Sequence, residues 1–517
     1  MATDSRFLAS SGREIFTGNE LLVKGALEIE GGVHLLTGYP GSPVANFFDI
    51  LGDIKDLVVK NGIRAFQANN EALGVAAVNG SQMAPCRALA CMKSVGVHVA
   101  ADALALGNLA GANPEGGAVI IMGDDPWCDS TQVPADSRFI CEHLRMPVVE
   151  PGTPQELKDW IDLSFKLSKA AELYIGYIVT TVQADGGGTV QCKPNQFPAL
   201  NTRQRVALDT QQVNFDKVLL PPRTWQHELQ LPGRFTRTIA AARELGLNRI
   251  IPAWRAEDAG TRGHGDAGKE EGDCKLQSEN CKVQIDGGAT PPAPQFEISD
   301  LKSEICNPPS SLPTSPRPRV PASSSPAPLG FIVTGMGGPY LEHVLADLGL
   351  SGVFPILQMG MSYPVDVQLV VEFSALCKDM IVIEERRSFL EKNIRDTLYH
   401  TLPAEQAANL SGRLFGKTFP NGISGIPEGR GLNPSVLAQI LIPLIKATEE
   451  IPAELRNGRL TAELDRIRKA SKPKLKIFDD KVVSRTPTFC PGCPHRDSSA
   501  ALLDLRKNLA DPKYMLE

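Results

Sequence analysis

The chain has 517 residues, of which 42% are hydrophobic and 22% charged, and these values are typical of a globular protein with roughly two to four cored domains. Its formal net charge of −6 gives no electrostatic reason to expect nucleic acid or an anionic membrane as a partner. The segment MATDSRFLASSGREIF lacks a basic region followed by an apolar run, and no run of about eighteen apolar residues occurs, so we expect a cytoplasmic protein without a membrane span.

Cysteine usage gives no sign of a secreted scaffold. The eleven cysteines are odd in number, thinly spread and mostly placed within apolar segments. Secreted disulfide scaffolds are short chains in which an even number of cysteines recurs at close spacing. We therefore expect most of these residues to be reduced thiols in the core.

Residues 1–185 alternate short apolar runs with helical stretches that are rich in small residues. In chain order the runs are VHLLTGY (33–39), RALACM (87–92), GGAVIIMGDD (116–125), MPVVEP (146–151) and ELYIGYIVTT (172–181). Continuous apolar strands separated by helices are typical of a parallel sheet that is covered on both faces. The sequence therefore predicts a doubly wound α/β domain over this range.

The pattern changes several times after residue 185. Residues 186–256 have weak periodicity and no clear assignment, whereas residues 257–329 are rich in proline, serine and charge and are expected to be a disordered linker or surface insertion. Periodicity returns at LGFIVTGMG, which predicts a second, smaller α/β domain over residues 330–400. We interpret residues 401–484 as a connector and residues 485–517 as the start of a further domain.

The first candidate site follows the strand that ends at Tyr39. Apolar residues at helical spacing begin at Val44, so a helix should start close to this loop. One interpretation makes Ser42 the N-cap and Pro43 a residue of the first helical turn. The other adds a ligand anion at the exposed amides, with the Ser42 hydroxyl as an extra donor.

Glu71 is the second candidate. It follows Asn70 and precedes a helix of alanine, glycine and valine in NNEALGVAAVNGSQMA. One interpretation makes it a first-turn carboxylate that the helix dipole favours. In the other, the small side chains allow close approach by another chain or a flat ligand, which would remove the carboxylate from water. A carboxyl group in that setting could exchange a proton with a heterocycle.

Two further strand ends carry polar residues. Lys93 ends one apolar run and His98 lies in the helix that follows, and both can be explained as a solvated lysine and a packed histidine. The next strand is followed by acids at positions Asp124, Asp125, Asp129 and Asp136. They could bind a hard cation, but such acids more often cap loops, so we expect no metal there.

Several segments, taken in order, resemble one protein family. They are TGYPGSP, NNEALGVAAVNGSQMAPCRALACMKSVGVHVAADAL, EGGAVIIMGDDPWCDSTQVPADSR, MPVVEPGTPQELKD, LQMGMSYPV, IVIEE and TFCPGCPHR. The family is that of the indolepyruvate ferredoxin oxidoreductase alpha subunits, within the thiamine-diphosphate-dependent 2-oxoacid:ferredoxin oxidoreductases. The resemblance covers roughly residues 15–185 and 328–400 and resumes near residue 485. It implies a first domain of the thiamine-diphosphate-binding type and a second domain like the C-terminal domain of transketolase.

The resemblance also implies a chemistry. Members of this family use the thiazolium ring of thiamine diphosphate to attack the keto carbon of an arylpyruvate, release carbon dioxide and pass two electrons through iron–sulfur clusters to ferredoxin, forming an acyl-CoA. The implied cofactor is thiamine diphosphate with Mg²⁺, and the implied partners are an aryl 2-oxoacid, coenzyme A and ferredoxin. A beta- or gamma-type subunit and an oligomeric assembly are implied as well.

The resemblance assigns roles to individual residues. Glu71 matches the family glutamate that hydrogen-bonds the aminopyrimidine ring, and Asn70 and Gly96 lie in the matching cofactor-binding segments. Lys93, in a matching MK-x-VG segment, could bind the carboxylate of the 2-oxoacid. The matching loop that faces the reacting carbon and the substrate carboxylate consists of Tyr39, Pro40, Gly41 and Ser42.

The chain departs from the family in its metal-binding elements. No GDG turn, which holds Mg²⁺ and the diphosphate in the family, occurs in the 517 residues, and the ferredoxin-like cysteine runs are also absent. Cys490 and Cys493 match a CPGC motif that supplies [4Fe–4S] ligands in related enzymes. In the family this motif opens the diphosphate-binding domain, so the resemblance implies that residues 485–517 are the start of a truncated domain of that kind. Because a cluster needs four ligands, a reduced pair in a tight turn is the alternative interpretation.

We therefore interpret the chain as the pyrimidine-binding and adjoining part of an indolepyruvate-type oxidoreductase, either a split subunit or a truncated product. It would be inactive alone and would need a partner chain for diphosphate, Mg²⁺ and electron transfer. Two alternatives stay open. One is a non-catalytic remnant or oligomerisation subunit, and the other is half of a thiamine-diphosphate-dependent 2-oxoacid decarboxylase without redox chemistry.

Overall fold

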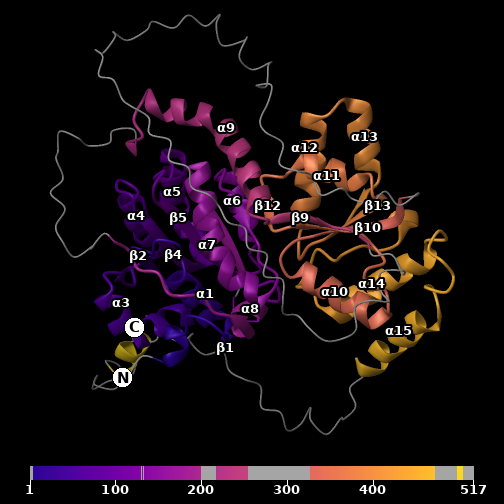
Figure 1. Ribbon diagram of the computed structural model, residues 1–517, viewed down its shortest axis with the longest axis horizontal. Helices are drawn as coiled ribbons and strands as arrows, with labels where there is room; N and C mark the ends of the chain where they lie inside the picture. The colour runs from indigo at the N-terminus through magenta and orange to yellow at the C-terminus, as the bar shows by residue number, and fades with distance from the viewer. Residues whose placement is uncertain are drawn as a thin grey trace, which may run out of the picture. The chain divides into compact units, whose positions relative to one another are not determined.

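The computed structural model describes residues 4–129, 131, 133–199, 217–253, 326–471 and 498–504 (Figure 1). The described residues before position 254 and after position 325 form one compact unit. Within these ranges, every helix is too short or too polar to cross a bilayer. The predicted linker lies outside the described residues up to position 325, and Cys490 and Cys493 also lie outside them.

The larger sheet has seven strands in the order β12-β6-β7-β5-β4-β2-β3. Their bounds are β2 (Leu35–Gly38), β3 (Arg64–Ala65), β4 (Arg87–Lys93), β5 (Gly117–Asp124), β6 (Val148–Val149), β7 (Tyr174–Thr180) and β12 (Met361–Tyr363). Neighbouring strands are parallel except for β12, which runs antiparallel to β6. The apolar runs in the sequence thus form the parallel centre of the sheet.

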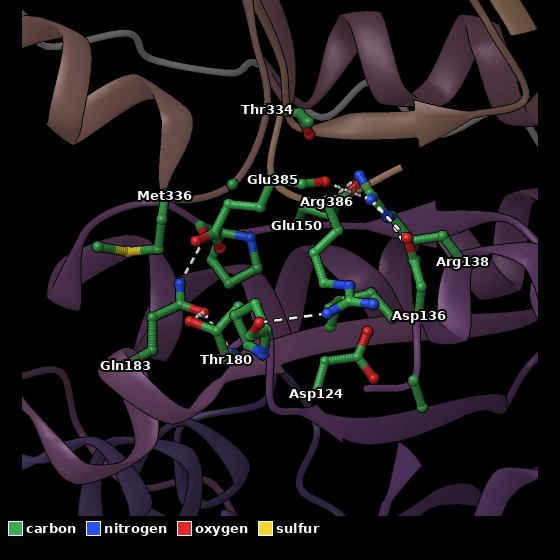
Figure 2. Close-up of a pocket in the computed structure, with 15 residues that line it drawn as sticks. Asp124, Asp136, Arg138, Glu150, Thr180, Gln183, Thr334, Met336, Glu385 and Arg386 are labelled. Atoms are coloured by element: carbon green, nitrogen blue, oxygen red, sulfur yellow. Dashed lines mark hydrogen bonds and ion pairs between the residues drawn. The ribbon is translucent and has the colours of Figure 1, made fainter. Parts of the chain in front are cut away.

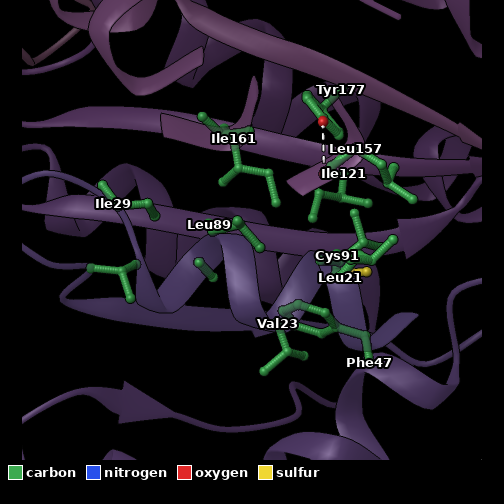
Figure 3. Packing of buried hydrophobic residues seen from close by; sticks show 14 of the residues in the cluster. Leu21, Val23, Ile29, Phe47, Leu89, Cys91, Ile121, Leu157, Ile161 and Tyr177 are labelled. Carbon is green, nitrogen blue, oxygen red and sulfur yellow. Dashed lines mark hydrogen bonds between the residues drawn. The ribbon is translucent and has the colours of Figure 1, made fainter. Parts of the chain in front are cut away.

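Helices cover both faces of this sheet. One face is covered by α1 (Gly18–Leu27), α2 (Asn46–Asp53) and α7 (Pro154–Ala171), and the other by α4 (Glu71–Ser81), α5 (Ser94–Ala110) and α6 (Ser137–His143). Successive strand residues alternate between the two cores, so Leu89 packs on one face and Ala90 on the other. Figure 3 shows part of the first core, to which Leu21, Leu89 and Ile161 belong. The predicted α/β fold class is therefore confirmed.

Local sequence signals explain the start of the long helix α7. The Thr153 side chain accepts a hydrogen bond from the Glu156 amide, and the Glu156 carboxylate accepts one from the Thr153 amide. This capping box, with Pro154 at the first helical position, satisfies amides that would otherwise lack partners. Leu157 and Ile161 then follow at helical spacing and are buried against the sheet.

Further elements surround the first sheet. They are the antiparallel pair β1 (Arg13–Thr17) and β8 (Gly187–Gln191), the 3-10 helix η1 (Ser5–Leu8), and the helices α3 (Lys55–Lys60), α8 (Thr181–Asp185) and α9 (Arg223–Glu244). Helix α9 contacts α7 and α5. It then leads into β9 (Asn248–Ile251).

The second sheet has five strands in the order β14-β13-β10-β11-β9. Besides β9, these are β10 (Ala327–Val333), β11 (Ile356–Met359), β13 (Cys377–Ile383) and β14 (Leu414–Phe415). One face is covered by α10 (Gly337–Leu348), α14 (Pro434–Ala447) and α15 (Gly458–Ala470), and the other by α11 (Val367–Ser374), α12 (Leu390–Thr401) and α13 (Ala404–Gly412). A short 3-10 helix, η5 (Pro420–Gly422), follows β14.

The two sheets exchange edge strands. Strand β9 follows the first sheet in the chain, yet it pairs antiparallel with β11 of the second sheet. Strand β12 lies between elements of the second sheet in the chain, yet it pairs antiparallel with β6 of the first. The Asn248 side chain accepts a hydrogen bond from the Met361 amide at 2.8 Å, which joins the two exchanged strands. Each sheet is therefore completed by a segment that leads to or from the other.

The structure contains helices and strands in two ranges whose elements were not predicted from the sequence. Residues 186–256, left without an assignment, contain β8, α9 and β9 among the described positions. Residues 401–484, interpreted as a connector, contain α13, β14, α14 and α15. Leu437 and Leu441 of α14 are fully buried in the second core. Of residues 485–517, positions 498–504 are described.

Candidate functional site

Apart from Cys490 and Cys493, which lie outside the described residues, the predicted site residues lie at one edge of the first sheet. Strands β2, β4 and β5 are parallel, so their carboxyl ends meet at the same edge. Open α/β sheets collect ligands in the crevice beyond this edge. The loop 39–43 follows β2, Glu71 begins the helix after β3, and Lys93 is the last residue of β4.

The loop 39–43 is attached to strand β4 and to the buried Asn19. The Tyr39 amide donates to the Cys91 carbonyl at 3.1 Å, and the Asn19 side chain donates to the Pro43 carbonyl at 3.1 Å. At the end of the loop, the Val44 amide donates to the Gly41 carbonyl at 3.0 Å. Within the loop, Tyr39 and Ser42 are half-buried, while Pro40 and Gly41 are buried. The Ser42–Pro43 peptide bond is cis.

The predicted N-cap role of Ser42 is wrong. Helix α2 begins at Asn46, and its N-cap is Ala45, which makes no side-chain capping bond. A turn formed by the Val44-to-Gly41 hydrogen bond precedes the helix, so the helix starts one turn later than the apolar spacing suggested. Ser42 is thereby left in the loop at the sheet edge, where its hydroxyl is not used as a helix cap.

Glu71 begins α4 and is only 6% exposed. Asn70 is the N-cap, because its side chain accepts a hydrogen bond from the Leu73 amide at 2.8 Å. The Glu71 carboxylate lies against Gly96 of α5, where an added β-carbon would be 2.2 Å from Glu71 Oε1. No residue in the described part of the chain donates a hydrogen bond to this carboxylate. The carboxylate oxygens are not among the fully buried polar atoms that lack a partner, so the carboxylate stays open to a group from outside these residues.

Lys93 lies beside the loop. A β-carbon at Gly41 would be 2.7 Å from Lys93 Cδ, so the glycine lets the lysine side chain pass close to the backbone. Lys93 is half-buried and is the N-cap of α5, whereas Gly96 is in the first turn of that helix. The start of α5 therefore makes two close contacts: Lys93 packs against Gly41, and Gly96 packs against Glu71.

The sequence interpretation missed two polar residues near this edge. Asn19 of α1 is 1% exposed, and its amide donates to the carbonyls of Pro43 and Ala184, each at 3.1 Å. Ser94 directly follows Lys93, and its fully buried hydroxyl has no hydrogen-bond partner among the described residues. A polar residue within the apolar helix GNELLVKGAL was the available signal for Asn19.

The acids after β5 cap loops and form ion pairs. Asp124 accepts hydrogen bonds from the amide and hydroxyl of Ser137, and Asp136 pairs with Arg138 at 2.8 Å. Asp125 accepts hydrogen bonds from the Thr131 amide at 2.9 Å and the Asp129 amide at 3.2 Å. No group of acids, histidines or cysteines that could hold a metal ion is found within the described ranges.

His98 lies apart from these contacts. It is exposed on α5, one turn beyond Ser94, and lines an open groove of about 570 Å³ together with Phe139, His143 and Arg387. The Arg387 guanidinium lies 4.0 Å from the centre of the Phe139 ring. The structure thus separates His98 from the group formed by Glu71, Gly96 and Lys93.

A second polar site lies where the carboxyl ends of the two sheets face each other. A cavity of about 30 Å³ is lined by residues at or just beyond the carboxyl ends of β5, β6, β7, β10 and β13, among them Asp124, Glu150, Thr334 and Glu385 (Figure 2). Burial, reinforced by the negative charge of Asp136, raises the pKa of Asp124 to about 7. Burial also raises the pKa of Glu385 to about 7.

Comparison with known proteins identifies relatives of one kind. No protein-family model matches the chain. The chain is 25% identical over 511 residues to indolepyruvate oxidoreductase subunit IorA of Archaeoglobus fulgidus, an alignment that covers 97% of this chain and 63% of the relative. It is 23% identical over 492 residues to the same subunit of Pyrococcus abyssi, covering 95% of this chain and 59% of the relative. The chain therefore spans about 60% of the length of the curated relatives that it matches.

A solved structure shares the fold. It is the 2-oxoglutarate:ferredoxin oxidoreductase from Magnetococcus marinus with 2-oxoglutarate, coenzyme A and succinyl-CoA bound. The two chains are 12% identical, with a TM-score of 0.50, and the match covers 83% of this chain and 64% of that chain. The resemblance drawn from the sequence motifs is confirmed by the IorA relatives, and the structural match supports the α/β fold class.

Proposed function

We propose that this chain, which is similar over nearly its whole length to IorA subunits, provides the aminopyrimidine-binding and substrate-binding part of a thiamine-diphosphate-dependent 2-oxoacid oxidoreductase. The substrate class proposed is an aryl 2-oxoacid such as indolepyruvate. The observation that carries the proposal is the buried Glu71 carboxylate, which faces Gly96 and receives no hydrogen bond from the described residues.

Glycines let the elements around Glu71 pack closely. A β-carbon at Gly74 would lie 2.9 Å from the α-carbon of Gly38, and one at Gly96 would lie 2.2 Å from Glu71 Oε1. These glycines therefore determine where the carboxylate lies, and we assign to that carboxylate the contact with the pyrimidine part of the cofactor. When bound, thiamine diphosphate would supply the carbon nucleophile and the electron sink for loss of carbon dioxide from the 2-oxoacid. Glu71 would donate a proton to the pyrimidine ring and take it back from the ring.

Lys93 and the loop 39–43 would orient the substrate. The side chain of Lys93 passes Gly41 and brings a positive charge to the edge of the sheet where the loop lies. A 2-oxoacid carries a carboxylate, and a charge-assisted hydrogen bond from a lysine is one of the stronger ways to hold it. The half-buried Tyr39 and Ser42 would then face the rest of the substrate.

Other parts of the reaction are assigned to further protein components. The sequence contains no GDG turn, and the described residues include no candidate metal-binding group. We therefore infer that Mg²⁺, the diphosphate and electron transfer to ferredoxin depend on a partner chain or on another part of the enzyme, within an oligomeric assembly that also binds coenzyme A. A [4Fe–4S] role for Cys490 and Cys493 stays a prediction, because both residues lie outside the described ranges.

The test is decarboxylation of indolepyruvate by the chain assembled with a partner that carries the diphosphate-binding element. Glu71→Gln keeps the shape of the side chain but cannot take up a proton, so the rate should fall by about 10² to 10⁴. Glu405→Gln is the matched control, since Glu405 is an exposed first-turn acid of α13. Equal rates for the two variants would reduce Glu71 to a helix-start residue and would contradict the proposal.

A further inference from the structure

A cluster of buried charged residues joins the two sheets away from Glu71. We call it the junction cluster, and it consists of Asp124, Asp136, Arg138, Glu150, Glu384 and Glu385. The first four come from the segments that form the first sheet, and the last two follow β13 of the second sheet. Exposure is 8% or less for all of them except Glu385, which is half-buried.

Arg138 is the central cation of the junction cluster. Its guanidinium forms two hydrogen bonds of 2.8 Å to Asp136 and one of 3.2 Å to Glu384, and it lies 3.8 Å from Glu150. It also donates to the Glu385 carbonyl at 2.8 Å. Arg138 thus donates to several acceptors, and two of them, the Glu384 carboxylate and the Glu385 carbonyl, follow β13 of the second sheet.

The other carboxyl contacts are neutral donors. Glu384 accepts hydrogen bonds from the amides of residues 389–391 at the start of α12, and Glu385 accepts one from the Leu432 amide at 2.8 Å. Glu150 accepts a hydrogen bond from the Ser362 hydroxyl. These donors stabilise charge without cancelling it, so the balance of charges decides how many carboxyl groups are ionised.

With all its carboxyl groups ionised, the junction cluster and the cations beside it carry a net negative charge. Besides Arg138, the cations close to the cluster are Arg386, which lines the cavity, and Lys417, whose ammonium donates to the Glu384 carbonyl at 3.1 Å. Five carboxyl groups therefore face three cations. The remaining titratable groups that face the cluster or Lys417 are Cys141 on α6, Tyr340 on α10, Glu391 on α12 and Glu428. None of these four adds a positive charge.

We propose that the junction cluster binds a proton at neutral pH, shared among Asp124, Glu150 and Glu385, and that this proton is needed to hold the ends of the two sheets together. The cavity of about 30 Å³ between these side chains is large enough for a water molecule to carry the proton from one to another. Thr334 also lines the cavity, and its buried hydroxyl has no hydrogen-bond partner within the described residues.

The pKa directions agree with this geometry. Burial raises the pKa of Asp124 and of Glu385, each to about 7, and it also raises that of Glu150 against the opposing charge of Arg138. Loss of the proton above this pH adds a negative charge that no nearby cation can balance. The contacts of Arg138 with Glu384 and Glu385 should then loosen. The site predicted around Glu71 would be affected as well, because Gly123 precedes Asp124 and packs against Pro43 of the loop 39–43.

Infrared difference spectroscopy of the whole chain tests the proposal directly. The carbonyl stretch of a protonated carboxylic acid should be present near pH 6, should disappear with a midpoint near pH 7, and should weaken in Asp124→Asn and in Glu385→Gln. Glu385 is half-buried at the edge of the cluster, so Glu385→Gln carries the test if Asp124→Asn does not fold. A bound cation in place of the proton would leave the carboxyl groups ionised, and the missing band would overturn the proposal.

Hydrogen exchange tests the effect on the junction. Protection of the amides of residues 389–391, which donate to Glu384, should fall in the wild type as the pH rises through about 7, and it should be less sensitive to pH in Glu385→Gln. Asp379→Asn is the matched control, because burial raises the pKa of this β13 residue outside the cluster. The same pH dependence in Glu385→Gln as in Asp379→Asn would contradict a role for the shared proton.

Discussion

Glu71 and Gly96 come from different helices and occupy adjoining space so closely that a β-carbon at position 96 would lie 2.2 Å from Glu71 Oε1. The glycine is thus a condition for the position of the carboxylate. Because the same helix turn also follows Lys93, one short segment determines how two of the candidate functional side chains lie.

Gly96→Ala should separate activity from stability. Alanine favours a helix by about 1 kcal/mol over glycine, and this gain opposes the cost of displacing the Glu71 side chain, so the free energy of unfolding in urea should change little. Because Glu71 must move, the activity of the assembled enzyme should fall as in Glu71→Gln. Gly80→Ala in α4 is the control, since an added β-carbon there has no neighbour within 4 Å. It should keep full activity. A fully active Gly96→Ala enzyme would show that the position of Glu71 is not needed.

Asn19→Ala should destabilise the fold by freeing the loop 39–43. The variant removes the buried hydrogen bonds to the Pro43 and Ala184 carbonyls, and leaving such acceptors without donors costs about 1 to 3 kcal/mol. Urea unfolding measures the loss. Asn61→Ala removes one bond, to the Leu57 carbonyl at a half-buried position, and should cost less than about 1 kcal/mol. Equal losses in both variants would mean that Asn19 does not hold the loop.

Lys93→Met should weaken substrate binding more than it slows turnover. The methionine keeps an apolar contact with Gly41 but removes the charge that we assign to the substrate carboxylate. Hydrogen bonds to charged groups contribute about 1.5 to 3 kcal/mol, so KM for the 2-oxoacid should rise by about 10- to 100-fold. Lys93→Arg should retain most of the affinity. An unchanged KM in Lys93→Met would remove this residue from the proposed substrate site.

The pH dependence of stability should report the junction cluster. A carboxyl whose folded-state pKa is raised destabilises the fold progressively between its unfolded pKa of about 4 and its folded pKa, which is about 7 for Asp124. Asp124→Asn should therefore match the wild type near pH 4 and become relatively more stable by pH 8, by a few kcal/mol at most, since one pKa unit corresponds to about 1.4 kcal/mol. Thermal unfolding from pH 4 to pH 8 measures this difference, and a constant difference would contradict it.

The sequence predicted what depends on local pattern. The apolar runs identified the central strands of the first sheet, and Glu71 does begin the helix that follows Asn70. The start of α2 was placed too early, because apolar spacing cannot reveal that a turn at Val44 uses the amide that would begin the helix.

Features that depend on distant contacts were not predicted. Strands β9 and β12 are four and three residues long, and nothing in such short segments specifies a partner in the other sheet. Arg138 and Glu384 are 246 positions apart, so their pairing becomes visible only when the sheet ends meet. Asn19 was missed for the same reason, since one of its acceptors, Ala184, lies 165 positions along the chain.

The most direct test of the account is the exchange of the thiazolium C–H of thiamine diphosphate with solvent, measured by NMR in the assembled enzyme. If Glu71 exchanges a proton with the pyrimidine ring, Glu71→Gln should slow this exchange by about 10² to 10⁴, while the control Glu405→Gln leaves it unchanged. Exchange at the wild-type rate in Glu71→Gln, with the cofactor bound and the fold intact, would contradict the role that we assign to Glu71.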